Sequence, residues 1–234
     1  MTLPQVLGQI ERIQACQKTH DYLLNDDGAK DALDYLLNKR GLTIDAIKKY
    51  QLGYCYEGFE DYRLAGKIIH PIHDVYDNLI AISTRKLKSK EFWHESFDKS
   101  MHLYGLNLIK HNIIKKQSVI VVEGEFDAIY MNSVGIDNVV SCMGTAFSLV
   151  QFIILSRYCN NIYLCFDGDE AGKKAINRVK SFLKDKLGFS SKYKFRDFNV
   201  KTVSIPNNKD PDDFIKENGT DAFYELVNFS NNLI

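Results

Sequence analysis

From residue 118 onward, the sequence repeats one pattern three times: a short apolar run, a tight turn, and a longer segment with helical spacing. The repeats are SVIVVEGEFDAIYMNSVGI, NVVSCMGTAFSLVQFIILSRY and NIYLCFDGDEAGKKAINRVKSFL, at 118–136, 138–158 and 161–183. Strands that alternate with helices in this way predict a mostly parallel sheet flanked by helices. A last strand is expected around 201–206, before a helix that begins near Asp210.

The first part of the chain has a different pattern, in which helical segments precede two strands. Apolar residues recur at helical spacing at Ala32, Leu33, Leu36 and Leu37. Gly41 is expected to end this helix, and Thr43 to cap a short helix that follows. The segment 67–85 reads as two strands around a polar turn at Asp77 and Asn78.

The change of pattern predicts two domains, with a boundary near residue 115. That position lies in the basic, polar stretch 110–117. Residues 1–115 are expected to form a mixed α+β amino-terminal lobe, and residues 116–234 an α/β domain with the parallel sheet and a C-terminal helical segment.

Composition narrows the class of protein without identifying a partner. Lys and Arg together number 30, as do Asp and Glu, and a neutral total leaves room for a basic groove beside an acidic site. The five cysteines form no CxxC pair, so we expect no zinc site built from this chain alone. No apolar run is long enough to cross a membrane, and the N-terminus lacks the features of a secretion signal, so a cytoplasmic protein is expected.

Acidic residues follow three of the predicted strands. They are Glu123, Asp167 and Asp169, and Asp210 and Asp212. Functional groups of open parallel sheets gather at the carboxyl ends of the strands, so these carboxylates are expected to converge there. Carboxylates so close together repel one another unless cations lie between them, and oxygen ligands suit Mg²⁺ or Mn²⁺. The pattern therefore favours phosphoryl or nucleotidyl transfer.

Each acidic motif also has a simpler interpretation. Asp169 could cap the helix that follows it, and Asp210 before Pro211 fits an ordinary helix N-terminus. Asp127 could orient a metal-bound water or only stabilise a helix dipole. Glu123 is harder to explain in this way, because a charge directly after a buried strand needs a partner or an ion. The prediction of a metal site therefore rests on the joint occurrence of these acidic motifs and not on any one of them.

Several segments resemble one family in its own order. VVEGEFDAIYMNSVGIDNVVSCMGTAFS and LCFDGDEAGKKAINR are similar to the glutamate block and the metal motif of bacterial replicative (DnaG-type) primases, whose catalytic core contains a Toprim domain. KDPDDFI resembles the third acidic motif of that family. YLLNKRGLTIDAIKKYQLGY, KIIHPIHDVYDNLIAISTRKL and FDKSMHLYGLN resemble the amino-terminal lobe and the segment that joins it to Toprim. The resemblance covers roughly residues 30–225.

This resemblance implies a DNA primase core that makes short RNA primers on single-stranded DNA from ribonucleoside triphosphates. The acids implied as metal ligands, for two or more Mg²⁺ or Mn²⁺ ions, are Glu123, Asp167, Asp169, Asp210 and Asp212; of these, Glu123, Asp167 and Asp169 are expected to be catalytic. The basic residues implied to bind template or nucleotide are Arg40, Arg85, Lys90 and Lys99. Asp127 and Lys173 are expected to have roles at the site that are secondary to those of the metal ligands, and Lys173 stands where the family usually has arginine.

The sequence also departs from the family. His70 replaces the usual aromatic residue before Pro71, and glycines are missing before Arg85. The zinc-binding and helicase-binding modules that usually flank this core are expected to come from separate proteins, as in a phage or plasmid system, or else the chain works differently. A replicative helicase, or a separate zinc-binding or helicase-binding protein, is the expected protein partner. Two other functions stay open: a Toprim-type metal-dependent nuclease, and a non-catalytic replisome adaptor that binds nucleic acid or helicase.

Overall fold

The computed structural model describes residues 3–58, 63–87, 89, 91–144, 146–187 and 198–233. Contacts divide the chain into two compact units, Met1–Phe97 and Asp98–Ile234. Each has helices and one sheet, in agreement with the predicted combination of an α+β lobe and an α/β domain. Within the described ranges, no helix has both the length and the apolar character needed to cross a membrane.

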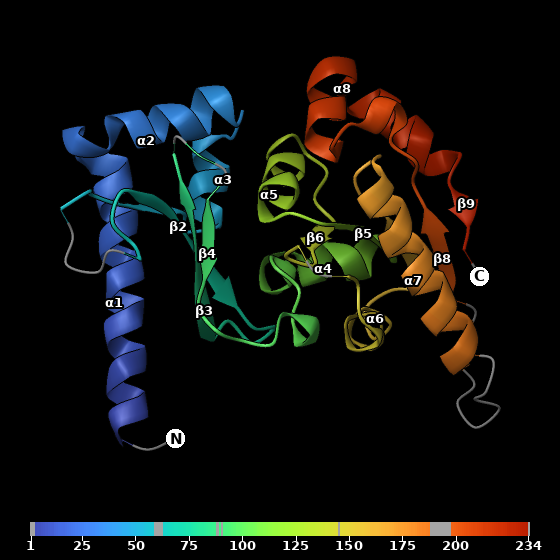
Figure 1. Cartoon of the computed structure of the whole chain (residues 1–234), viewed down its shortest axis with the longest axis horizontal. Helices are drawn as coiled ribbons and strands as arrows, with labels where there is room; N and C mark the ends of the chain where they lie inside the picture. Colours follow the sequence, from blue (N-terminus) through green and yellow to red (C-terminus); the bar gives the residue numbers. More distant parts are fainter. Residues whose placement is uncertain are drawn as a thin grey trace. The chain divides into compact units, whose positions relative to one another are not determined.

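The first unit is an antiparallel sheet with helices. Its helices are α1 (Leu3–Asn25), α2 (Lys30–Asp34) and α3 (Ile44–Lys49). Its strands, in spatial order, are β1 (Gly53–Cys55), β2 (Lys67–His73), β3 (Leu79–Lys86) and β4 (Phe92–His94). Helix α1 packs against β1 and lies beside the sheet in Figure 1. Most residues of the central strands β2 and β3 are buried.

The predicted helix end, helix cap and hairpin turn of the first unit are confirmed. Gly41 takes a φ of 72°, a backbone conformation that favours glycine, and the chain turns there before α3. Thr43 caps α3, because its hydroxyl oxygen accepts a hydrogen bond from the Ala46 amide at 3.1 Å. The turn between β2 and β3 has Asp77 at a φ of 69°, as expected for a polar hairpin loop.

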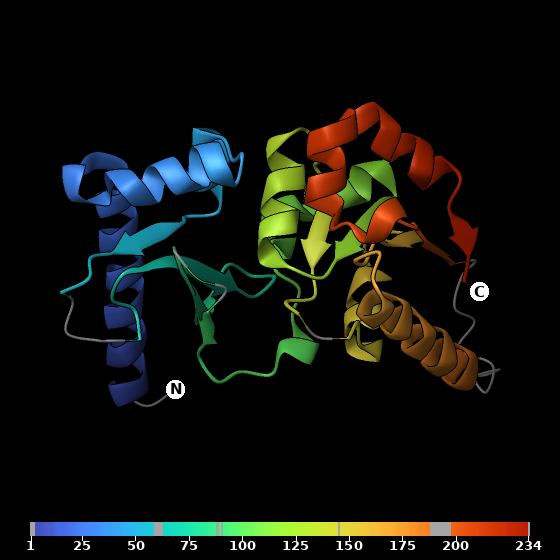
Figure 2. The same ribbon diagram turned by 45° about the horizontal axis from the view of Figure 1, so that its top comes forward.

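The second unit has a five-stranded sheet in the order β6-β5-β7-β8-β9, parallel except at β9. Its strands are β5 (Ser118–Val122), β6 (Val139–Ser141), β7 (Asn161–Leu164), β8 (Asn199–Thr202) and β9 (Asn231–Asn232). Its helices are α4 (Leu106–Lys116), α5 (Glu125–Ser133), α6 (Leu149–Leu155), α7 (Glu170–Leu187) and α8 (Pro211–Asn228). Figure 2 shows α5 and α8 on one side of the sheet and α6 and α7 on the other. The three predicted strand–helix repeats are confirmed.

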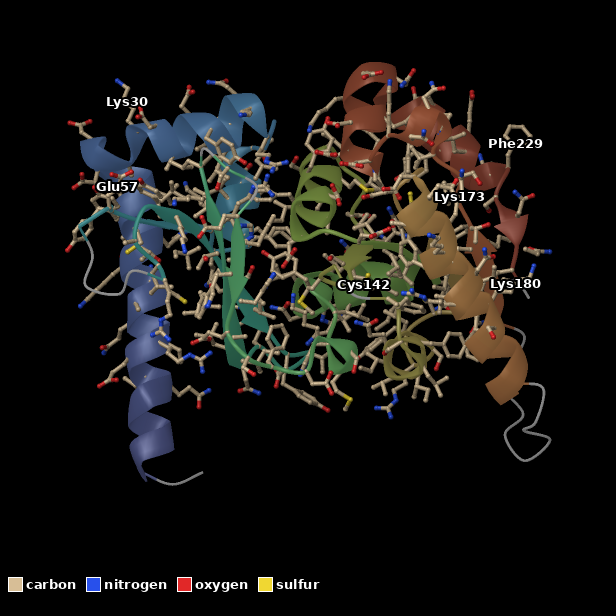
Figure 3. The ribbon with its side chains drawn as sticks, in the orientation of Figure 1. Lys30, Glu57, Cys142, Lys173, Lys180 and Phe229 are labelled. Carbon is tan, nitrogen blue, oxygen red and sulfur yellow. The ribbon has the colours of Figure 1, made fainter. Side chains whose placement is uncertain are left out.

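The contacts place α4 with the second unit. The predicted boundary lies near residue 115, at the end of this helix, whereas the compact unit begins at Asp98. Helix α4 packs on β5, and Tyr104 forms a bridge with Ser141 at the end of β6. The five cysteines are buried and form no disulfide bond with one another; Cys142, labelled in Figure 3, is among them.

Candidate metal centre and basic residues

Glu123 follows directly on β5, whose last four residues are buried. Its carboxylate Oε1 accepts a hydrogen bond from the Asp167 amide at 3.3 Å, which joins the ends of β5 and β7. Burial raises the pKa of Glu123, and the charges of Asp169 and Asp210 raise it further, while the hydrogen bond lowers it. Glu123 therefore lies among the other acids, as predicted from its position.

The turn after β7 is held against the segment that leads into α8. The Gly168 amide donates to the Lys209 carbonyl at 3.1 Å. A Cβ on Gly168 would lie 2.6 Å from the Ile205 carbonyl oxygen, so only glycine permits this approach. As a result, the carboxylates of Asp167 and Asp210, far apart in sequence, lie close enough for their charges to interact.

The pKa of half-buried Asp167 is strongly raised. Burial and then the charges of Asp210, Glu123, Asp169 and Asp212 raise its pKa to about 7. Within the part of the chain that the structure describes, its buried Oδ1 atom has no hydrogen-bond partner. A buried carboxylate oxygen with nearby like charges is a ligand suited to a cation.

The start of α8 brings three further carboxylates together. Among the described residues, oxygen atoms of Asp210, Asp212 and Asp213 all lie within 4.8 Å of one another. Asp210 holds the N-cap position, but its side chain makes no capping hydrogen bond. Asp210 therefore begins the helix before Pro211, as the simpler interpretation predicted, but not through a side-chain capping bond.

Two acids do have a structural role. Asp169 caps α7, because its Oδ1 accepts from the Gly172 amide at 2.9 Å. Asp127 accepts from the Gly124 amide at 3.1 Å at the start of α5. Burial raises the pKa of Asp127 well above its ordinary value, and the charges of Asp212 and Asp167 add to this. Capping and membership of the acidic cluster thus coexist in these two residues.

The residues present fit divalent cations. Carboxylates from β5, the turn after β7 and the start of α8 interact electrostatically, and burial is the first cause of the raised pKa values of Glu123, Asp127 and Asp167. A cation among them would relieve both effects. The donor set consists of oxygen atoms, which suits hard ions such as Mg²⁺ or Mn²⁺.

The predicted basic residues lie in both units. In the second, Lys99 precedes α4, and its Nζ donates to the Met143 carbonyl at 3.3 Å. Burial lowers the pKa of Lys99, against which the Glu125 charge acts. In the first, Arg40 and Arg85 are half-buried and share a hydrogen-bond acceptor, Tyr35.

Two further lysines, Lys90 and Lys173, were predicted from the family resemblance. Lys90 lies outside the described residues. Lys173, labelled on α7 in Figure 3, pairs with exposed Glu170 at 2.9 Å. A pair at the surface like this one contributes little to stability.

Sequence reasoning missed three residues of the second unit. Lys216 lies one helical turn after Asp212 and bonds its carboxylate at 2.6 Å; its i+4 spacing was a visible signal. Asp213 belongs to the closest carboxylate group. Gln151 is fully buried, and its Nε2 donates to the carbonyls of Lys99 and His102 at 3.1 and 2.7 Å, a long-range contact that no local pattern indicates.

Comparisons with known proteins agree with this geometry. The model of a Toprim-like family matches residues 120–215. A DNA primase of Clostridium acetobutylicum is 35% identical over 172 aligned residues, which cover 70% of this chain and 27% of that protein. A DNA primase of Synechococcus elongatus is 30% identical, covering 91% of this chain and 35% of that protein.

A solved structure extends the likeness to the fold. A DNA primase domain from Pseudomonas aeruginosa matches with a TM-score of 0.81 and 25% identity, over 96% of this chain and 79% of that one. The chain spans about a third of the length of the two curated relatives. By sequence and by fold, the chain belongs to the family of bacterial DnaG-type DNA primases and aligns with the part of them that carries the Toprim domain.

Proposed function

We propose that this chain is a primase catalytic core that synthesises short RNA primers on single-stranded DNA by metal-dependent nucleotidyl transfer. The observation that carries the proposal is the meeting of carboxylates from three separate segments at one end of the sheet. Because these carboxylates lie close together, burial and the neighbouring acids raise the pKa of Asp167 to about 7. Family membership implies the use of divalent metal ions.

Glu123, Asp167, Asp169, Asp210 and Asp212 are the proposed ligands, for two or more ions of Mg²⁺ or Mn²⁺. When bound, such ions activate a hydroxyl group and neutralise charge on the attacking and leaving oxygens of phosphates. Glu123 either binds metal, accepts the proton of a ribose 3′-hydroxyl, or does both; its raised pKa suits proton acceptance. Asp127 fixes the start of α5 and so the backbone next to Glu123.

Arg40, Arg85, Lys90 and Lys99 are the proposed contacts to template or nucleotide phosphates. Such contacts position nucleic acid without reading its sequence and weaken as salt rises. Gln151 donates a hydrogen bond to the main-chain carbonyl of Lys99, and the Lys99 ammonium group donates to the Met143 carbonyl. These two contacts favour a fixed position of the ammonium group. A replicative helicase, or a separate zinc-binding or helicase-binding protein, is the proposed protein partner.

The test is primer synthesis by purified protein on single-stranded DNA with ribonucleoside triphosphates and Mg²⁺ or Mn²⁺. We expect the wild type to make short RNA. In Asp167→Asn, synthesis should fall at least about a hundredfold, because asparagine keeps the shape of the side chain but loses the negative charge that would bind the metal. Exposed Asp45→Asn, in the first unit, is the matched control and should retain full synthesis.

Two results would contradict the proposal. One is undiminished synthesis by Asp167→Asn in a preparation free of other polymerases. The other is cleavage of labelled nucleic acid in the absence of nucleotides, with no synthesis in their presence, which would assign the site to a nuclease.

A further inference from the structure

The hydroxyl group of Tyr35 joins two basic residues from distant parts of the first unit. Its oxygen accepts a hydrogen bond from Arg40 Nε at 2.9 Å and from Arg85 Nε at 3.2 Å. Arg40 lies just after the helical segment that contains Tyr35, whereas Arg85 lies on β3, 50 residues from Tyr35. One neutral oxygen thus brings two permanently charged guanidinium groups side by side.

The backbone around Tyr35 explains how Arg40 reaches it. Residues Tyr35–Lys39 form a single π-helical turn, and the Arg40 amide donates to the Tyr35 carbonyl at 2.9 Å. The wider turn carries the Arg40 side chain back over the Tyr35 ring, at 5.6 Å from its centroid. Single π turns inside helices are frequent at functional sites.

Arg85 is held from two directions. On β3 it is opposite Phe92 of β4, and its guanidinium group lies 4.5 Å from the centroid of the Phe92 ring. The Tyr35 hydroxyl holds the Nε edge of the same group. A planar group fixed by an aromatic face and by one hydrogen bond is pre-organised for binding an anion.

Both arginines also lower the pKa of a third residue, His70. His70 on β2 is fully buried, and burial lowers its pKa to about 3, with further lowering by Arg85, His94 and Arg40. The shared Tyr35 oxygen, at 2.9 and 3.2 Å from the two Nε atoms, places the two charges close together. Like charges at short range repel, and an anion between them would remove this repulsion.

We propose that Tyr35 is a positioning residue that holds Arg40 and Arg85 as a paired binding site for one phosphate group. The inference deepens the proposed function, since it names how two of the suggested phosphate contacts are arranged. The phosphate belongs either to the nucleic-acid backbone or to a nucleoside triphosphate. Arg side chains suit both, because each can donate two parallel hydrogen bonds to phosphate oxygens.

The test is the binding of a fluorescent single-stranded DNA oligonucleotide, and separately of Mg²⁺-ATP, to Tyr35→Phe. This substitution removes one oxygen atom and keeps the ring, both arginines and the net charge. We expect binding of one of the two probes to weaken about five- to tenfold. Arg85→Lys should weaken the same probe, because it keeps the charge but loses the Nε donor and the planar group. Tyr54→Phe, at a buried tyrosine of the same unit, should bind both probes as the wild type does.

A double-mutant cycle separates positioning from a general structural effect. In an Arg40→Gln, Arg85→Gln background, Tyr35→Phe should have no further effect on binding. Weakening of the DNA probe would assign the phosphate to nucleic acid, and weakening of Mg²⁺-ATP would assign it to a nucleotide. Unchanged binding of both probes, or an equal loss in the double-arginine background, would overturn the inference.

The binding assays involve no chemistry, so they can succeed where the proposed function fails. Wild-type protein that makes no RNA, but whose Tyr35→Phe variant shows the coupled loss of binding, would refute the primase proposal and keep the phosphate site. Wild-type protein that makes RNA, with unchanged binding in Tyr35→Phe, would do the reverse.

Discussion

The contact between Lys216 and Asp212 shows how a single cation shapes the acidic cluster. Asp212 is buried, and the Lys216 Nζ lies 2.6 Å from its Oδ2 and 3.4 Å from Asp213. The same ammonium group lies 4.9 Å from the centroid of the Tyr130 ring. Burial lowers the pKa of Lys216, but the hydrogen bonds and charges of Asp212 and Asp213 together raise it above its ordinary value. Lys216 therefore neutralises an acid that sequence analysis assigned to metal alone.

Removing this cation should destabilise the metal-free protein. We expect Lys216→Met to lower the free energy of unfolding by about 1–3 kcal/mol, because it leaves a buried carboxylate without its counter-ion, although solvent screens the partly exposed lysine. Lys173→Met is the matched control: its partner Glu170 is exposed, so the change should stay within about 0.5 kcal/mol. Denaturant unfolding with chelator present measures both. Equal losses in the two variants would show that the Lys216 pair has no special role.

At the scale of elements, the turn between β7 and α7 decides whether the acids meet. Gly172, in the first turn of α7, has its backbone against Asp167, and a Cβ there would lie 2.1 Å from the Asp167 carbonyl oxygen. An added methyl group must therefore displace the loop that carries Asp167.

Gly172→Ala is expected to reduce primer synthesis on the order of a hundredfold, since small displacements of catalytic groups have effects of this size. The fold should survive, because the substitution adds one methyl group to a helix. Gly8→Ala in α1 is the control: nothing lies within 4 Å of the added carbon, so activity should be unchanged and stability equal or slightly higher. Wild-type synthesis by Gly172→Ala would mean that the loop position does not limit the reaction.

The same elements show what the sequence could and could not predict. The strands β5 and β7, the cap at Thr43 and the helix after Asp210 follow from local patterns of apolar and capping residues. By contrast, the close approach of Gly168 to Ile205 and the hydrogen bond from Arg85 to Tyr35 join segments that are far apart in the sequence and meet only in the folded chain. Long-range contacts leave no periodic signal, so Tyr35 and Gln151 were not predicted as site residues. Lys216 was missed although its i+4 spacing from Asp212 is local.

For the whole molecule, two groups give stability opposite dependences on pH. His70 has a pKa lowered to about 3, so its contribution is complete above its ordinary value of 6.5 and is lost as the pH falls. Asp167 has a pKa raised to about 7, so its contribution is complete below the ordinary value of 3.8 and is lost as the pH rises through 7. Metal-free protein at pH 8 therefore contains unrelieved repulsion in the second unit.

His70→Phe separates the two effects. The carboxylates are common to both proteins, so they cancel in the difference between variant and wild type. We expect the wild type to lose about 2 kcal/mol relative to His70→Phe between pH 7 and pH 5, because only the wild type must keep an imidazole uncharged. Exposed His111→Gln is the control and should follow the wild type. A difference that does not vary with pH would exclude His70 as the acid-sensitive group.

We propose that carboxylates of the second unit jointly hold divalent cations. Calorimetric titration of Mn²⁺ into chelator-treated protein at pH 8 tests it most directly, with Asp167→Asn, Asp210→Asn and the control Asp45→Asn alongside. We predict saturable binding by the wild type and by Asp45→Asn, and at least about tenfold weaker binding by the other two variants. Equal binding by all four proteins would contradict the claim.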